Sequence, residues 1–183
     1  MGFGALKSRI AHFKEDLRGT ILVEFVIISP VFIMLIAMGF EFFDAFKSYN
    51  RAQKASYTIA DMVSRDTEFG DSDMQMMHAF LDGLLPWMNG KKDLRISSLS
   101  YKDGKYSVAW SDVTKRGYKE LVAKDLTGDI AGKLPDIAEN DTVIVIETRV
   151  PHRPLIDLFD MSDIVWENTI VIRPRYVREI KPI

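Results

Sequence analysis

The sequence predicts an α+β fold in which a long N-terminal helix packs on a small antiparallel sheet. Three observations lead to this prediction. One apolar run, residues 21–40, is long enough to cross a bilayer as a helix. Apolar residues then recur at steps of three and four as far as about residue 85. From residue 94 onward the period changes to two, which is typical of half-buried strands.

The apolar run is interrupted only by Glu24 and Ser29. A helix rises ~1.5 Å per residue, so the run covers ~30 Å, the thickness of one hydrocarbon core. It has no polar face, and a buried soluble helix of this length would normally have one. We therefore expect a membrane helix, in which a proline is tolerated. The residues expected to lie in the bilayer include Ile21, Val26, Pro30, Phe32 and Leu35.

Basic residues precede the apolar run, and the first one that follows it is Lys47. The preceding ones are Lys7, Arg9, Lys14 and Arg18. The positive-inside tendency then predicts a cytoplasmic leader at 1–19, a transmembrane helix at 20–40 and an extracytoplasmic α+β domain at 41–183. A secretory signal peptide is the alternative, since Ala37-Met38-Gly39 offers a cleavage site between small residues.

The domain is expected to begin with a continuation of the same helix, from Glu41 to about Glu68, ended by Gly70. Its apolar stripe comprises Phe42, Phe46, Tyr49, Ala52, Ser56, Ile59 and Val63. We expect this stripe to pack on the protein's own sheet, and contact with a neighbouring subunit is the alternative. A second helix follows, capped by Asp71 or Ser72 and ended by Pro86.

The strands follow from alternation. Residues 94–101 and 106–110 predict a hairpin around Asp103-Gly104, a dipeptide typical of type I′ turns. Two more strands are expected at 142–150 and 168–180, and Pro174 places the end of the last one at an edge or a bulge.

The segments between these strands read as loops. Residues 114–137 are polar and contain regularly spaced glycines, which predicts a loop with a short helix. Residues 151–166 predict a loop with one helical turn.

The composition of the chain argues against several classes of function. The chain of 183 residues has no cysteine and a net charge of −2, so it has neither a thiolate site nor the basic footprint of a nucleic-acid-binding protein. Its histidines, His12, His78 and His152, form no metal-binding or catalytic motif. We therefore expect no enzyme activity, no metal and no cofactor.

Glu24 needs an explanation because a carboxylate inside lipid costs free energy. One explanation is that it lies near the headgroups and extends toward them. Another follows from spacing. If the chain were cut between Gly19 and Thr20, the new amine on Thr20 would lie about one helical turn from Glu24. The carboxylate would then neutralise its own amine or that of a neighbouring subunit.

A basic tail, a glycine, four residues, a glutamate and an apolar helix together resemble the type IV pilin class of signal. The stretch RGTILVEFVIISPVFIMLIAMGFEFFDAF is similar to the TadE/TadG-like pseudopilins of the tight-adherence (Flp) pilus systems. DTVIVIETRVPHRPLIDLF and NTIVIRPRYV resemble strands of the same family, the second with a closing R-P-R. Two features differ from the major Flp pilins: Phe25 stands where they have tyrosine, and this chain is far longer.

The resemblance implies a pilin-like fold and a minor pseudopilin that contributes to the biogenesis, priming or tip of an adhesive pilus. It implies cleavage between Gly19 and Thr20 by a prepilin peptidase and an assembly role for Glu24. The expected partners are other pilins and the Tad secretion machinery, in the inner membrane of a bacterium. Arg173, Arg175 and Arg178 are interaction candidates because they close the family-like motif.

An uncleaved, membrane-anchored extracytoplasmic binding module is the alternative function. The same anchor and sheet would then present a partner surface, and Glu24 would have no special task.

Overall fold

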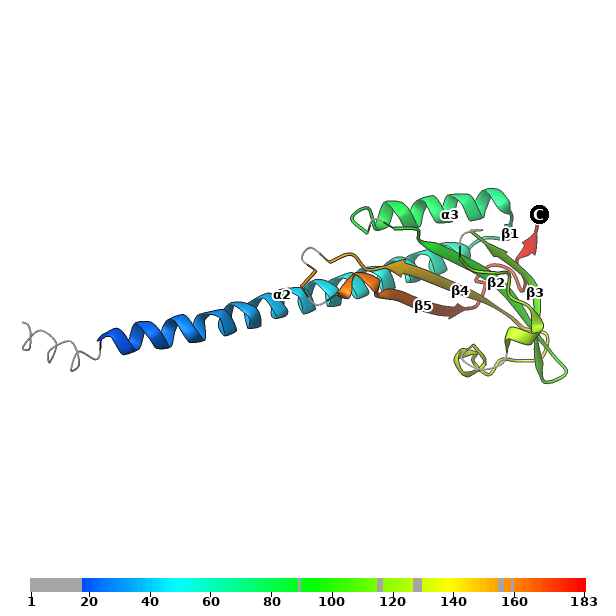
Figure 1. The fold of residues 1–183 in the computed structure, drawn as a ribbon. Coiled ribbons are helices and arrows are strands. Elements are labelled where there is room, and N and C mark those ends of the chain that lie inside the picture. Colours follow the sequence, from blue (N-terminus) through cyan, green and yellow to red (C-terminus); the bar gives the residue numbers. More distant parts are fainter. Residues whose placement is uncertain (1–17, 89, 115–116, 127–129, 155–156, 159) are drawn as a thin grey trace, which may run out of the picture. The chain divides into compact units, whose positions relative to one another are not determined.

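A computed structural model of the chain describes residues 18–183, except residues 89, 115–116, 127–129, 155–156 and 159. The chain consists of two compact units, unit 1 (Met1–Phe43) and unit 2 (Asp44–Ile183). Figure 1 shows the helices and strands, coloured along the sequence. The helix α2 (Arg18–Val63) is the long N-terminal helix that the sequence predicts.

The predicted helix extends too far at its C-terminal end, because α2 stops at Val63 rather than near Glu68. Its last turn is closed by short-range bonds: the Ser64 hydroxyl donates to the carbonyl of Asp61 at 2.8 Å, and the Arg65 amide donates to Met62 at 3.0 Å. These bonds use carbonyls that would otherwise lack partners at a helix end. Gly70 therefore does not terminate α2.

Gly70 instead caps the second helix, α3 (Asp71–Leu84), so the prediction of Asp71 or Ser72 as the cap was wrong. The Gly70 amide donates to the carboxylate of Asp73 at 2.9 Å, which satisfies one free donor at this helix start. The helix ends two residues before Pro86, close to the predicted end.

Unit 2 also contains a four-stranded antiparallel sheet with the order β3-β2-β4-β5. Its strands are β2 (Asp93–Lys102), β3 (Lys105–Val113), β4 (Thr142–Pro151) and β5 (Val165–Ile172). The predicted hairpin joins β2 to β3, and its turn residues Asp103 and Gly104 have φ of 52° and 72°, as a type I′ turn requires. The described residues of the two long loops include three 3-10 turns: Ala123–Leu126, Ala131–Lys133 and Met161–Asp163.

The last predicted strand is displaced. β5 starts at Val165, inside the predicted loop, and ends at Ile172, before Arg173 and Pro174. After β5 the chain leaves the sheet, and β6 (Lys181–Pro182) pairs in parallel with β1 (Glu68–Phe69). Sequence periodicity did not indicate this pairing, because two-residue strands show no alternation.

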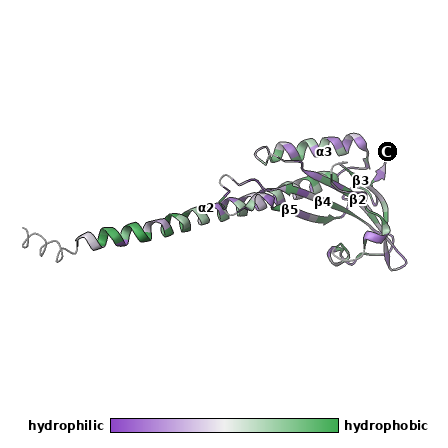
Figure 2. Cartoon of the chain, viewed as in Figure 1, coloured by the Kyte–Doolittle hydropathy of each residue, from purple (hydrophilic) through white to green (hydrophobic). Residues whose placement is uncertain are grey.

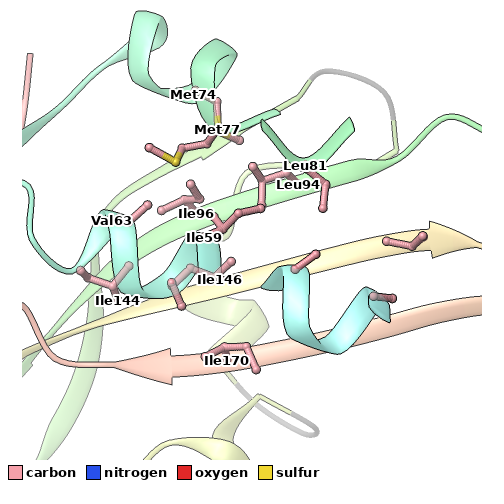
Figure 3. Packing of buried hydrophobic residues seen from close by; sticks show 14 of the residues in the cluster. Ile59, Val63, Met74, Met77, Leu81, Leu94, Ile96, Ile144, Ile146 and Ile170 are labelled. Carbon is pink, nitrogen blue, oxygen red and sulfur yellow. The ribbon is translucent and has the colours of Figure 1, made fainter. Parts of the chain in front are cut away.

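One face of the sheet is covered by α3 and by the part of α2 in unit 2. Figure 3 shows the apolar side chains that meet there. They include Ile59 and Val63 of α2, Met74, Met77 and Leu81 of α3, and Leu94, Ile96, Ile144, Ile146 and Ile170 of the sheet. A helix packed on the protein's own antiparallel sheet is thus confirmed.

The predicted stripe of α2 is right only in its C-terminal half. Ala52, Ser56, Ile59 and Val63 are buried, whereas Phe42 and Phe46 are each 65% exposed. The buried face continues toward the N-terminus through Ser48 and Ala45, and Phe46 follows Ala45 by one position, which is ~100° around the helix.

Candidate functional site: the N-terminal helix

The described part of the chain is helical from its start at Arg18, so Gly19, Thr20 and Glu24 all lie in the first turns of α2. The three residues are exposed, and among the described residues no atom beyond the neighbouring backbone of the same helix lies within 4 Å of a Cβ built on Gly19. Thr20 and Glu24 stand four residues apart in a regular helix, so their side chains share one face. The structure therefore has the spacing on which the expected amine–carboxylate pair depends.

The apolar run that follows is exposed along its length. Within the described residues, α2 is the one helix long and apolar enough to cross a membrane, with a mean hydropathy of 2.7 in its most apolar window and none of that window buried. Figure 2 shows this hydrophobic N-terminal stretch in green. Ile21, Val26, Phe32 and Leu35 are between 57% and 67% exposed. So much exposed apolar surface is unfavourable in water, which favours a lipid or protein environment.

Pro30 lies inside α2 without ending it. Proline has no amide hydrogen, so the carbonyl of Val26, four residues earlier, loses its usual helical donor. The Ser29 hydroxyl lies 3.5 Å from that carbonyl, at the long end of hydrogen-bonding distance. Ser29 therefore partly replaces the missing bond, and sequence reasoning had not assigned it this role.

Two polar contacts join α2 to the sheet in unit 2, and sequence reasoning missed both. Ser56 and Thr148 place their hydroxyl oxygens 2.7 Å apart. Ser48 accepts a bond from Trp166 Nε1 at 2.9 Å, and its Oγ lies 2.9 Å from His152 Nδ1. The available signal was the small size of the buried helix residues, which allows a helix to approach a sheet closely. These residues are Ala45, Ser48, Ala52, Ala55, Ser56 and Ala60.

The three arginines proposed for interaction follow β5. Arg173 lies 3.3 Å from the carboxylate of Asp141, and Arg175 lies 2.5 Å from that of Asp61. The Arg175 amide also donates to the carbonyl of Ser64 at 2.8 Å. Arg178 is exposed. Two of the three guanidinium groups thus already pair with carboxylates of the same unit.

A charged cluster on the other face of the sheet was also missed. Arg95 and Glu147 form a buried ion pair of 2.6 Å, and Arg95 also donates to the carbonyl of Lys119 at 2.9 Å. The Tyr118 ring lies on two guanidinium groups, 4.7 Å from that of Arg95 and 4.3 Å from that of Arg149. Burial, together with the nearby Glu147, raises the pKa of Tyr118 above its ordinary value. These contacts fasten the loop after β3 to the sheet.

Among the described residues there is no group of three or more histidine or carboxylate side chains that could hold a metal ion.

A family model described as TadE-like protein matches residues 19–61. Over this stretch the chain is TadE-like. The TadE-like match begins at Gly19, includes Thr20 and Glu24, and ends two residues before the end of α2. It does not extend to the sheet. The comparisons with curated proteins and with solved structures found no match.

The resemblance that the N-terminal motif indicates is thus confirmed. The match covers residues 19–61 of the 183-residue chain, so it characterises the N-terminal helix and not the sheet. One long apolar helix agrees with a single membrane span or a pilin anchor.

Proposed function

We propose that this protein is a minor pseudopilin that contributes to the biogenesis, priming or tip of a Tad (Flp) pilus. The observation that carries the proposal is the one-turn spacing of Thr20 and Glu24 on an exposed helical face at the start of the TadE-like match. After cleavage between Gly19 and Thr20, the Thr20 amine would carry a positive charge beside the Glu24 carboxylate. Such a pair in lipid would be strongly attractive, and either charge alone would be costly.

The pairing also sets a register for assembly. When a processed helix packs beside another pilin helix, Glu24 can neutralise the amine of that neighbour instead of its own. Only one axial offset brings the two groups together, so the pair favours one arrangement of subunits. In this proposal Ile21, Val26, Pro30, Phe32 and Leu35 contact lipid before assembly and other helices afterwards.

The proposed topology is a single span in the bacterial inner membrane. Residues 1–19 form the basic cytoplasmic leader, residues 20–40 cross the bilayer, and residues 41–183 lie outside the cytoplasm. The proposed partners are a prepilin peptidase, other pilins and the Tad secretion machinery. Arg178 is the best remaining candidate among the three arginines for contact with a partner, because Arg173 and Arg175 already pair with Asp141 and Asp61.

The intact mass of the protein extracted from native membranes tests processing. A chain that begins at Thr20 supports the proposal. A chain that begins at Met1 favours a permanently anchored binding module, and a start near Phe40 indicates a secreted domain.

Substitution of Glu24 tests assembly separately from processing. Glu24→Ala should abolish incorporation into pili, measured by the pilus content of sheared cell-surface fractions. Val23→Ala is the matched control, since Val23 is the exposed neighbour of Glu24 and carries no charge. Normal piliation by Glu24→Ala would contradict the proposal.

A further inference from the structure

A cavity of about 330 Å³ lies on the charged face of the sheet, beside the loop after β3. We call it the sheet cavity. Its size is near the lower end of the range of about 300–1,000 Å³ that is usual for small-ligand sites. The residues with hydrogen-bond donors that line it are Arg95 of β2, Arg149 of β4, Thr169 of β5, and Tyr118, Lys119 and Lys133 of the loop between β3 and β4.

Two carboxylates also line the sheet cavity, and each is paired with an arginine. Glu147 pairs with Arg95 at 2.6 Å, and this pair is buried. Glu167 lies 2.7 Å from Nε of Arg149, whose side chain is 38% exposed. Among the described residues, the two terminal nitrogens of Arg149 have no hydrogen-bond partner. This guanidinium therefore still has donors that a ligand can use.

The two lysines of the sheet cavity are not neutralised by the described part of the chain. Lys119 has no acidic partner there, and Nζ of Lys133 lies 3.2 Å from the Thr169 hydroxyl, which carries no charge. Four basic and two acidic side chains thus leave two positive charges in the lining. Asp93 packs against Gly117 at the edge of the cavity, and counting it still leaves one positive charge.

Contacts on both sides of Lys119 hold it in place without a ligand. Its carbonyl accepts a hydrogen bond from Arg95 at 2.9 Å, and the preceding residue, Tyr118, lies on two guanidinium groups. Two residues later, the Leu121 amide donates to the Ser111 hydroxyl at 2.9 Å. A site that is formed in advance loses less conformational entropy when it binds.

We propose that the sheet cavity binds a phosphate group, either as the free ion or as a phosphate monoester such as a lipid headgroup. Phosphate carries between one and two negative charges near neutral pH and accepts several hydrogen bonds. A guanidinium with two free nitrogens, together with ammonium groups, is the donor set that proteins use for phosphate. The inference concerns unit 2 alone and depends neither on the membrane anchor nor on a role in pili.

A titration followed by phosphorus NMR tests the proposal on the full chain in detergent micelles. The probes are inorganic phosphate and glycerol phosphate, a soluble form of a lipid headgroup, with malonate as a competitor. Salt is held at about 0.15 M, where attraction between distant charges is screened. Lys119→Gln and Lys133→Gln are the cavity variants. Lys105→Gln is the matched control, since it removes the same charge from an exposed site at the start of β3, outside the lining.

We expect a dissociation constant of about 1 mM or lower for inorganic phosphate. Each cavity variant should weaken binding by about fivefold or more, because a charge-assisted donor is lost, and Lys105→Gln should bind normally. Binding of glycerol phosphate as well assigns the site to monoesters, and binding of inorganic phosphate alone assigns it to the free ion.

Three results would overturn the proposal: no binding of either phosphate probe, unchanged affinity in either cavity variant, or an equal loss in Lys105→Gln. Displacement of phosphate by an equal concentration of malonate would overturn it too, because the cavity would then select negative charge and not phosphate.

Discussion

The hydroxyl oxygens of Ser56 and Thr148 lie 2.7 Å apart, although the residues are 92 positions apart in the chain. Both residues are fully buried, and the contact joins α2 to β4, one of the two inner strands of the sheet. The Ser56 hydroxyl also donates to the carbonyl of Ala52 at 2.9 Å. Ser56 therefore accepts its second bond from Thr148.

This arrangement predicts unequal costs for the two substitutions. Ser56→Ala leaves the Thr148 hydroxyl buried without its acceptor and should lower the free energy of unfolding by about 1–3 kcal/mol. Thr148→Val leaves Ser56 with a partner and should cost about 1 kcal/mol. The double variant should match Thr148→Val, as measured by denaturant unfolding of the detergent-solubilised chain. Additive costs would contradict the predicted coupling.

The Arg95–Glu147 pair predicts a larger effect. Their side chains are only 11% and 8% exposed, so Arg95→Met would leave a buried carboxylate without its partner. We expect a loss of about 3–5 kcal/mol in the free energy of unfolding. When Glu147 is also replaced by methionine, most of this loss should be recovered, because no buried charge then remains. A double variant no more stable than Arg95→Met would show that the charge itself is not what destabilises the protein.

Tyr118 predicts a dependence on alkaline pH. Its pKa is raised in the folded state, so as pH rises past the ordinary value of 10.0 the unfolded chain releases this proton first. The unfolded state is then favoured, and stability falls with pH above that value. Tyr118→Phe should weaken this fall while keeping the ring between the two arginines. Unfolding midpoints at pH 9–11 measure it, since this range brackets the ordinary tyrosine pKa of about 10. Tyr176→Phe, at an exposed site, is the control, and an equal effect in both variants would refute the assignment.

Asp61 predicts a small effect in spite of its two ion pairs. Its carboxylate lies 2.7 Å from the guanidinium of Arg65 and 2.5 Å from that of Arg175. However, the side chain of Asp61 is 39% exposed, and those of the two arginines are about half exposed. Pairs of this kind contribute about 0–1 kcal/mol, so Asp61→Asn should lower stability by no more than that, and by less in high salt. Asp141→Asn, which removes the Arg173 pair, provides a comparison. A loss above about 2 kcal/mol for Asp61→Asn would show that these pairs hold unit 2 together.

A signal confined to two neighbouring residues predicted the hairpin correctly. Asp103-Gly104 located the hairpin because the turn conformation depends on those two residues alone. The spacing of Gly19, Thr20 and Glu24 predicts a processing and assembly site, and this stays a prediction; the structure shows only that the three residues lie in one helix.

Contacts between distant segments were not predictable in the same way. Nothing near Arg175 in the sequence points to Asp61, and nothing near Lys181 points to Glu68, its partner in the small parallel sheet. β5 was placed too late because Val165 and Trp166 follow a polar loop, and their pairing with β4 decides where the strand begins. Pairing between strands sets such boundaries, and the periodicity of the sequence does not show which strands pair.

The alanine and serine face of α2 gives this part of the core an unusual mutational tolerance. Ala52 is fully buried, and Ala55 and Ala60 are 3% and 1% exposed, so no side chain there has volume to lose. Elsewhere in a core, substitutions to smaller residues are the harmful ones. Along this face the order is reversed, because added methyl groups would push the helix away from the sheet. A library that randomises Ala52, Ala55 and Ala60 should therefore keep alanine and serine and lose leucine and phenylalanine, and glycine should be rare because it costs ~1 kcal/mol inside a helix.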